Sequence, residues 1–368
     1  MRRSRLNFIF AIQIILFLAH AVVFATWVSL WDANPADVSR FGIAFGLLSV
    51  SFVGASLLAF RYYNLFVRAL YTAAAIWLGI LNFCVLASLV CWVVYGGERL
   101  ARVAWPPRDL VLTVFGLAAV LAFYGTANSF VLRVRRLEVS LPNLPDAWRN
   151  RVAALVSDTH LGPVRAARFS RRVAKLLNRL RADIVFLTGD FYDGTAADVF
   201  KLANPLALLE APLGAYFVTG NHEEFSNPRQ YRDALAKAGV RVLHSEAVNV
   251  EGLQIVGISY HELATSERFR DALVRTGLDP AVPSILLVHA PNRLWEAEQA
   301  GVSLQLSGHT HRGQFFPWTL AVSRIYGKFA YGLHKLGNMQ VYITSGAGTW
   351  GPPLRLGTDP EIVLFRFV

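Results

Sequence analysis

The sequence predicts an all-α bundle of four transmembrane helices followed by an α/β domain, and two observations predict this division. The first third of the 368-residue chain holds four long apolar runs without a charged residue, and hydrophobic residues make up 54% of the whole sequence. After Leu132 the pattern changes to short apolar runs that alternate with polar helical stretches, which is typical of an α/β domain.

Each of the four apolar runs is long enough to cross a hydrocarbon core of about 30 Å as a helix. The runs cover about residues 6–31, 41–60, 69–95 and 110–132, so residues 1–133 are predicted to form a transmembrane domain. The basic leader MRRSR would also suit a secretory signal peptide. The first apolar run far exceeds the roughly 7–15 residues of a signal peptide's hydrophobic region, which favours a membrane anchor.

The arginines that flank these runs predict which side of the membrane the chain ends face. The amino terminus, the connection between the second and third runs, and the segment after the fourth run together carry eight arginines, whereas the two opposite connections carry four. Since basic residues are enriched on the cytoplasmic side, both chain ends and the second domain are predicted to lie in the cytoplasm.

The second domain, residues 134–368, is predicted to contain alternating strands and helices. Strands are expected at residues 152–157, 184–188, 216–219, 242–244, 253–259, 284–288, 304–306, 340–344 and 362–367. A helix is expected at residues 165–181, with an apolar stripe on one side and a basic stripe on the other. The basic stripe fits a solvated helix face, and it also fits a face that contacts anionic lipid headgroups or an acidic substrate.

Residues with metal-ligating side chains follow five of the predicted strands. The segments are SDTHLG with Asp158 and His160, GDFYDG with Asp190, GNHEEF with Asn221 and His222, VHAPN with His289, and GHTHRGQ with His309 and His311. Five of the nine histidines therefore stand just after an apolar strand. Because loops at the carboxy ends of strands in an open α/β sheet converge on one crevice, these segments are expected to be neighbours in space.

The converging residues predict a metal centre with two ions. Aspartate oxygens, imidazole nitrogens and an asparagine carbonyl oxygen suit Mn, Fe, Zn or Co, and the segments contain no cysteine for a structural zinc site. There are seven ligands, too many for one ion: Asp158, His160, Asp190, Asn221, His289, His309 and His311. Two cations about 3.5–4 Å apart need a bridging anion, and we expect Asp190 to provide it with each carboxylate oxygen facing one ion.

His222 is expected to be catalytic rather than metal-ligating. It stands next to Asn221 in a Gly-Asn-His turn, so its imidazole would point in another direction, toward the place of a leaving-group oxygen. Histidine has an ordinary pKa of about 6.5, which suits the role of general acid.

The five segments, in this order, resemble the five motif blocks of the calcineurin-like metallophosphoesterase superfamily. The resemblance covers about residues 134–368 and implies a four-layer α/β/β/α sandwich with a dinuclear centre at the strand ends. It also implies how the ligands divide: Asp158, His160 and His311 on one ion, Asn221, His289 and His309 on the other, Asp190 between them, and His222 assisting the leaving group. The extension GHTHRGQFFPW, the tail SGAGTWGPPLRLG and the amino-terminal spans resemble the membrane-anchored bacterial branch, which implies a multi-pass protein of the inner membrane.

Two further residues are expected near the substrate. Arg312 stands where this branch often carries glycine, and its guanidinium would either hold a substrate phosphate through two hydrogen bonds or face the solvent. Glu223 stands where aspartate is commoner, and it is expected to orient His222 or its loop rather than bind metal. His261 with Glu262, and Trp350, fit either the pocket or the surrounding structure.

Together these features predict a membrane-anchored enzyme that hydrolyses a phosphodiester, a pyrophosphate or a phosphomonoester with two divalent metal ions. The tether favours a lipid-linked substrate, because some membrane-bound relatives are similar to UDP-2,3-diacylglucosamine pyrophosphatases. Two alternatives stay open: a nuclease or nucleotide phosphodiesterase, which the basic helix would serve, and a metal-binding membrane sensor without catalysis. The expected partners are the lipid bilayer and the phosphate ester; nucleic acid is less favoured, and no obligate protein partner is inferred.

Overall fold

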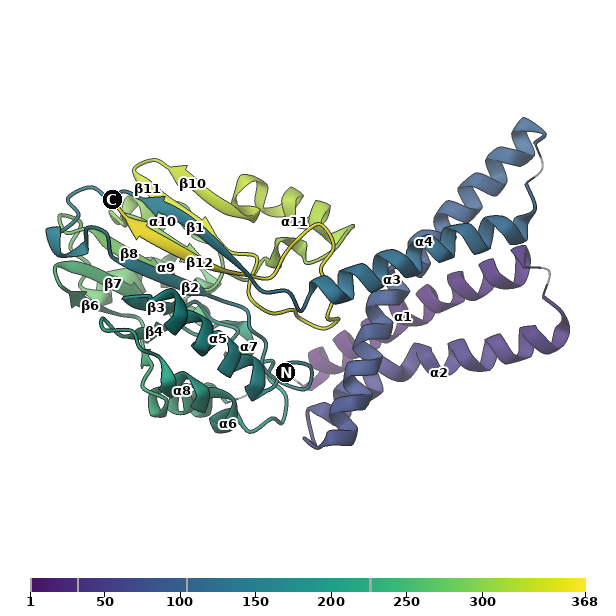
Figure 1. Cartoon of the computed structure of the whole chain (residues 1–368), viewed down its shortest axis with the longest axis horizontal. Coiled ribbons are helices and arrows are strands. Elements are labelled where there is room, and N and C mark those ends of the chain that lie inside the picture. Colours follow the sequence, from purple (N-terminus) through teal and green to yellow (C-terminus); the bar gives the residue numbers. More distant parts are fainter. Residues whose placement is uncertain (1, 32, 104, 225–226) are drawn as a thin grey trace. The chain divides into compact units, whose positions relative to one another are not determined.

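The structure of the protein is a computed structural model that describes residues 2–31, 33–103, 105–224 and 227–368, with the backbone alone at residues 2–5. The chain divides into two compact units, which we call the helical unit and the α/β unit (Figure 1). The helical unit consists of Met1–Asn128 and Gly351–Leu354, and the α/β unit consists of Ser129–Trp350 and Arg355–Val368. Each unit has its own hydrophobic core.

Four helices make up the helical unit: α1 (Arg2–Leu30), α2 (Pro35–Ala59), α3 (Leu65–Ala101) and α4 (Pro107–Asn128). Each contains a stretch long and apolar enough to cross a membrane, which confirms the four predicted segments and supports a membrane protein. The helix ends differ from the prediction. For example, α2 begins at Pro35 because the Asn34 side chain caps it by accepting a hydrogen bond of 3.0 Å from the Asp37 N–H.

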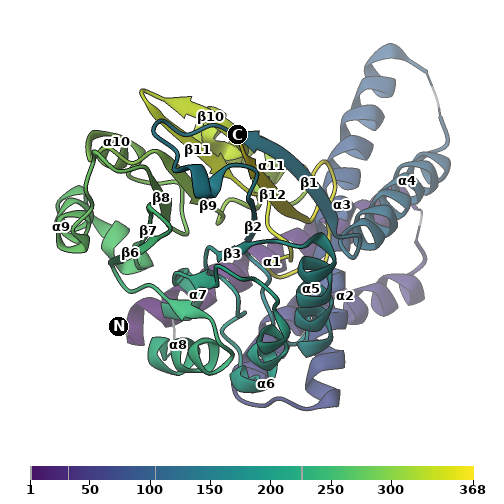
Figure 2. The ribbon, with the colours of Figure 1, turned by 60° about the vertical axis from the view of Figure 1, so that its left-hand side comes forward.

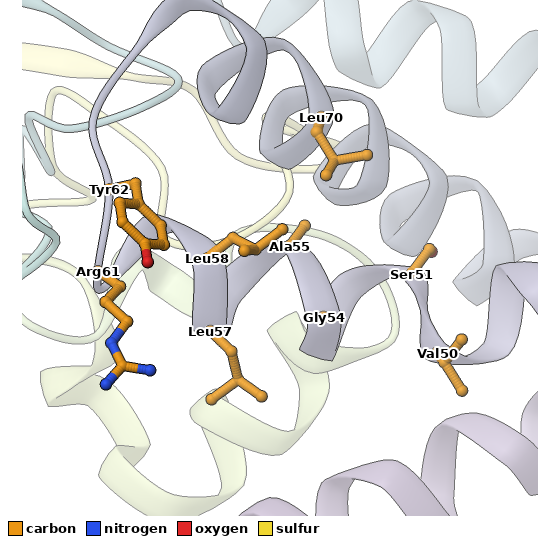
Figure 3. A pocket seen from close by; sticks show the side chains of 9 residues that line it. All are labelled: Val50, Ser51, Gly54, Ala55, Leu57, Leu58, Arg61, Tyr62 and Leu70. Carbon is orange, nitrogen blue, oxygen red and sulfur yellow. The ribbon is translucent and has the colours of Figure 1, made fainter.

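Polar groups in these apolar helices are paired across the helical unit. Trp77 Nε1 donates a hydrogen bond of 2.9 Å to His20 Nε2, and Gln13 Nε2 donates one of 2.9 Å to the Ser49 carbonyl oxygen. A groove of about 610 Å³ lies along α2 and α3, with Arg61 and Tyr62 at one end (Figure 3). None of its lining residues is a predicted metal ligand.

Two six-stranded sheets form the centre of the α/β unit. The first has the order β1-β12-β2-β3-β4-β5 and the second has the order β10-β11-β9-β8-β7-β6. The strands of the first are β1 (Arg133–Val139), β12 (Glu361–Phe367), β2 (Val152–Val156), β3 (Ile184–Leu187), β4 (Ala215–Phe217) and β5 (Arg241–Val242). Those of the second are β10 (Gly332–Leu336), β11 (Met339–Ile343), β9 (Leu304–Ser307), β8 (Ser284–Leu287), β7 (Leu253–Gly257) and β6 (Glu246–Val250).

Alternating side chains of the strands build the layers. Leu155 of β2 and Ile285 and Leu287 of β8 belong to one core cluster that contains residues of both sheets. The intervening Leu286 of β8 belongs to a different cluster, where Phe269 of α9 (Ser266–Thr276) also packs. Figure 2 shows α9 and α10 (Leu294–Gln299) on one side of the two sheets, and α5 (Ala167–Leu180), α6 (Val199–Ala203) and α8 (Pro228–Lys237) on the other. The predicted four-layer α/β/β/α sandwich is therefore confirmed.

Parallel strands place the loops that carry the predicted ligands. In the first sheet β2, β3, β4 and β5 are parallel, and in the second β7, β8, β9 and β11 are parallel. The carboxy ends of β2, β3 and β4 therefore share one edge of the first sheet, and those of β8 and β9 share one edge of the second. Three strands that the sequence analysis did not predict, β1, β6 and β10, are all edge strands.

Candidate metal centre

Backbone hydrogen bonds hold the loops at the strand ends together. The Asp158 N–H donates to the Gly189 carbonyl oxygen at 3.1 Å, and the His160 N–H donates to that of Asp190 at 3.1 Å. Across to the second sheet, the His309 N–H lies 3.1 Å from both carboxylate oxygens of Asp158. The last of these contacts joins residues 151 positions apart in the chain.

Asp158, His160 and His311 form the first donor group. His160 Nε2 lies 3.0 Å from His311 Nε2, and His311 Nε2 lies 3.4 Å from Asp158 Oδ1. All three side chains are buried. Two ring nitrogens and a carboxylate oxygen at such distances face a common point, where a cation or a proton has to offset their repulsion.

Asp190, Asn221, His289 and His309 form the second donor group. Two ring nitrogens lie next to Asn221 Oδ1: His289 Nε2 is 3.2 Å and His309 Nδ1 is 3.1 Å from that oxygen. The two ring nitrogens are 3.2 Å apart. Asp190 Oδ2 is 3.2 Å from His289 Nε2. His289 Nδ1 is 2.8 Å from the Thr188 carbonyl oxygen, a contact that orients the ring with Nε2 toward the group.

One oxygen of Asp190 faces both donor groups. Asp190 Oδ2 is 3.8 Å from His160 Nε2 of the first group and 3.2 Å from His289 Nε2 of the second. The other oxygen, Oδ1, accepts a hydrogen bond of 2.9 Å from the His222 N–H. The arrangement thus differs from the expectation that the two oxygens would face opposite ways, because the turn that contains His222 uses Oδ1.

Five of the seven predicted ligands have a left-handed backbone. The φ angles are 53° at Asp158, 46° at His160, 49° at Asp190, 69° at His309 and 47° at His311. Such a conformation costs an L-residue roughly 1–2 kcal/mol, so the surrounding fold has to maintain it. Strained residues of this kind cluster at functional sites, and here they cluster among the donor groups.

Burial and neighbouring charges set the protonation of the imidazoles. Burial, with His289 nearby, lowers the pKa of His309 to about 4, and burial lowers the pKa of His311 well below its ordinary range. Burial also acts to lower the pKa of His289, but Asp190 and Asp158 outweigh it and raise the value to about 10. His309 and His311 are therefore neutral at pH 7, which is the form that binds a metal ion, and the oxygen and nitrogen donors suit a divalent cation.

Glu223 ties together the two loops that carry Asp190 and Asn221. Its carboxylate accepts hydrogen bonds from the N–H groups of Asp190 at 2.9 Å, Tyr192 at 3.0 Å and Gly220 at 2.7 Å. The residue is fully buried. A buried carboxylate that accepts three backbone hydrogen bonds is suited to orienting these loops.

His222 lies beside the first donor group. Its ring centroid is 4.7 Å from that of His160 in an edge-to-face arrangement, and its Nδ1 is 3.2 Å from the Asp193 carbonyl oxygen. The Asp193 carboxylate in turn lies 3.6 Å from His160 Nδ1. The exposed ring of Trp350 has its centroid 6.3 Å from that of His222.

The contact that the structure shows for the Arg312 guanidinium is with the ring of Tyr331, which belongs to neither donor group. The guanidinium lies 4.5 Å above the ring of Tyr331, and the residue is exposed. Tyr331 itself is held in place, since its hydroxyl donates to Glu361 at 2.8 Å and accepts from Arg135 at 2.6 Å. His261, which the sequence analysis assigned either to the pocket or to the surrounding structure, is paired with Glu224 at 3.3 Å and with Glu262 at 3.4 Å.

Two residues near the donor groups were missed by the sequence analysis. Tyr260 has its ring centroid 5.8 Å from that of His289 and 6.1 Å from that of His309. Arg355 is fully buried and donates to the carbonyl oxygens of His311 at 3.0 Å, Ser345 at 2.7 Å and Gly348 at 2.6 Å. Both had a signal in the sequence: Tyr260 follows a predicted strand, and Arg355 is the one charged residue of the tail SGAGTWGPPLRLG.

Comparison with known proteins points to one family. A family model for the calcineurin-like phosphoesterase matches residues 152–313. An "Uncharacterized metallophosphoesterase" from Aquifex aeolicus is 35% identical over 253 residues, which cover 67% of this chain and 96% of that protein. A "Transmembrane protein with metallophosphoesterase domain" from Danio rerio is 30% identical over 283 residues, covering 69% of this chain. One of the same name from Bos taurus is 32% identical over 249 residues, covering 62%.

The chain covers 62% of the Danio rerio relative and 55% of the Bos taurus relative, so it spans less than two thirds of either. The family model spans all seven predicted ligands, and the three relatives are named as metallophosphoesterases or as containing such a domain. They support a phosphoester hydrolase that uses divalent metal ions. By sequence, by fold and by its buried His/Asp clusters, the chain belongs to the calcineurin-like metallophosphoesterase family.

Proposed function

We propose that the protein is a membrane-anchored hydrolase of a phosphodiester, a pyrophosphate or a phosphomonoester that works with two divalent ions of Mn, Fe, Zn or Co. The position of Asp190 Oδ2 between the two donor groups, 3.8 Å from His160 Nε2 and 3.2 Å from His289 Nε2, is the observation that carries the proposal of two ions. The first donor group would hold one ion and the second the other. Ions bound there supply Lewis-acid activation of the phosphoryl group and of the attacking water.

His222 is the proposed general acid, which protonates the departing oxygen of the ester. The contact between its Nδ1 and the Asp193 carbonyl oxygen, at 3.2 Å, orients the ring, and Nε2 is the atom we propose for the proton transfer. Its ring packs edge-to-face against that of a predicted ligand, His160, so the leaving group would lie next to the first donor group.

Arg312 is proposed to contact a substrate phosphate from the rim of the site. Its stacking on the anchored ring of Tyr331 holds the guanidinium in place while leaving the edge with its N–H groups available for an anion. The alternative, a solvent-facing arginine, predicts that replacing Arg312 with alanine changes neither KM nor kcat.

The proposed substrate is lipid-linked, such as a phosphodiester or pyrophosphate of the UDP-2,3-diacylglucosamine type. Four helices that could span a membrane precede the α/β unit, which supports a substrate that stays in the bilayer. The excess of arginines at the amino terminus, in the connection between α2 and α3 and just after α4 supports an inner-membrane protein with its α/β unit in the cytoplasm.

Two measurements on the purified full chain test this proposal. Elemental analysis of metal-replete protein should find about two divalent ions per chain, and removal of the ions with a chelator should abolish hydrolysis of bis(p-nitrophenyl) phosphate until they are restored. Mass spectrometry of phospholipids and nucleotide sugars from cells that lack the gene should then show which phosphate ester accumulates. Accumulation of nucleotides or nucleic-acid fragments alone would favour a nuclease or nucleotide phosphodiesterase, and metal binding without turnover would favour a sensor.

A further inference from the structure

The helix α11 (Trp318–Tyr326) is unusual among the helices of the α/β unit because it buries none of its residues. Its apolar side chains are exposed instead: 55% of Trp318, 62% of Leu320 and 73% of Ile325 is accessible. The helices α5, α8 and α9 each bury apolar residues. An ordinary surface helix turns its polar residues outward, whereas α11 presents much of its apolar surface to its surroundings.

The segment around α11 is basic and contains no acidic residue. Between Glu298 and Asp359 the sequence has no aspartate or glutamate. In the same stretch four basic residues are exposed, namely Arg312, Arg324, Lys328 and Lys335. Exposed apolar residues together with basic residues and without acidic ones are complementary to an anionic lipid surface.

The connection between the helical unit and the α/β unit is short. Only residues 129–132 lie between the end of α4 at Asn128 and the start of β1 at Arg133. Four extended residues span at most about 14 Å. With such a short tether, lipid headgroups are the surface that α11 meets at the highest effective concentration.

We propose that α11 is an interfacial helix that inserts its apolar face into the headgroup layer of an anionic membrane. The aromatic residues at its two ends, Trp318 and Tyr326, are of the kind that concentrates at membrane interfaces. Arg324 and Lys328 lie where they can pair with lipid phosphates. This orientation follows from the surface of α11 and does not depend on the catalytic activity.

Insertion of α11 would also bring the predicted ligands to the membrane surface. His311 lies in the short η4 turn (His311–Gly313), seven positions before Trp318, where α11 begins. The Thr319 N–H donates to the Phe315 carbonyl oxygen at 3.3 Å. Gly313 has room for hydrogen alone, because a Cβ there would collide with the Trp318 carbonyl oxygen and the Thr319 nitrogen. The start of α11 and the ligand turn therefore move as one piece. Under the proposed function, this selects phosphate esters whose phosphorus lies in the headgroup layer.

Fluorescence quenching on the full chain in nanodiscs tests the insertion. The chain has two cysteines, Cys84 and Cys91, which are replaced by alanine so that a single NBD probe is attached at Leu320→Cys or Ile325→Cys. The matched control is Val274→Cys on α9, an apolar residue that is 79% exposed. The nanodiscs contain phosphatidylethanolamine and phosphatidylglycerol, with a nitroxide quencher either on the lipid headgroup or acyl chain, or as a water-soluble compound.

We expect the lipid nitroxide to quench the probes at 320 and 325 severalfold more strongly than the probe at 274. This difference should become much smaller when phosphatidylcholine replaces phosphatidylglycerol. Equal quenching of all three probes by the water-soluble nitroxide would overturn it. Protection of 320 and 325 from both quenchers would also overturn it, since α11 would then be covered by protein. Quenching does not report hydrolysis, so a failure of the proposed function leaves this result unaffected.

Discussion

The carboxylate of Glu223 accepts a hydrogen bond of 2.9 Å from the backbone N–H of Asp190, and the same oxygen accepts one of 2.7 Å from Gly220. One buried side chain thus fixes the loop after β3, which carries Asp190, relative to the loop after β4, which carries Asn221. Burial and the charge of Asp190 raise the pKa of Glu223 to about 7, while the hydrogen bonds from Tyr192 and Gly220 act to lower it.

Replacement of Glu223 is expected to weaken metal binding without removing a ligand. Glu223→Ala leaves three buried N–H groups without their acceptor, each at a cost of about 1–3 kcal/mol, and releases the two loops. We expect lower metal affinity together with a lower melting temperature, measured by metal titration and thermal unfolding. Glu223→Gln keeps one acceptor oxygen, so its metal affinity and melting temperature should lie between those of the alanine variant and the wild type. Normal metal affinity in the alanine variant would contradict the orienting role.

Asp190→Asn is expected to lower metal content and hydrolysis together. An amide has no negative charge to offset two neighbouring cations, and its nitrogen is not a ligand. Elemental analysis and hydrolysis of bis(p-nitrophenyl) phosphate measure the two effects. The control is Asp193→Asn, whose carboxylate lies 3.6 Å from His160 Nδ1 and is not one of the seven predicted ligands. We expect the control to lose roughly 10–100-fold in affinity or activity while still binding metal.

His222→Ala is expected to keep its metal and to lose most of its activity. The His222 ring is a proposed proton donor and belongs to neither donor group, so all seven predicted ligands are still present in the variant. Loss of a general acid typically costs about 10²–10⁴-fold in rate. The measurement is kcat for bis(p-nitrophenyl) phosphate beside the metal content of the same sample. Unchanged turnover would remove the general-acid role, and loss of metal would make His222 a ligand.

A pair of glycine variants separates crowding at the site from backbone strain. Gly189 and Gly239 have similar left-handed φ angles, 85° and 81°. A Cβ at Gly189 would lie 2.6 Å from the Gly220 nitrogen and 2.8 Å from His289 Nδ1, whereas nothing lies within 4 Å of one at Gly239. Gly239→Ala should cost about 1–2 kcal/mol of stability and leave metal binding intact. Gly189→Ala should cost more and weaken metal binding, as thermal unfolding and metal titration would show; equal effects would rule out the close approach.

Arg165 is expected to be a stabilising residue of the α/β unit. It is 3% exposed, donates to the Ser129 carbonyl oxygen at 2.7 Å and to the Thr349 hydroxyl, and lies against the rings of Phe130 and Phe169. Lysine lacks the planar guanidinium that makes the hydrogen bonds and the ring contacts simultaneously. We therefore expect Arg165→Lys to lower the free energy of unfolding by about 1–3 kcal/mol. Arg179→Lys, at an exposed position on α5, the helix that follows Arg165, is the control and should be close to wild type.

Most of the strands that could be predicted have two covered faces. β3 reads IVFL and β8 reads SILL, and every residue in both is buried, so apolarity alone indicates them. The strands that were missed, such as β1 with RVRRLEV and β10 with GLHKL, lie at sheet edges and keep exposed polar residues. An edge strand is held by pairing with its neighbour, and this partner is not visible in the local sequence.

The sequence by itself determined four apolar helices, an α/β domain, and the residue types that stand at the ends of its strands, because hydrophobic periodicity and strand-end position are local properties of the chain. Only the tertiary structure decided that a single oxygen of Asp190 faces both donor groups, that Glu223 is buried under three N–H groups, and that α11 exposes its apolar side. These features depend on the packing of two sheets against each other, which sets side-chain directions through contacts between residues such as Asp158 and His309 that are far apart in the chain.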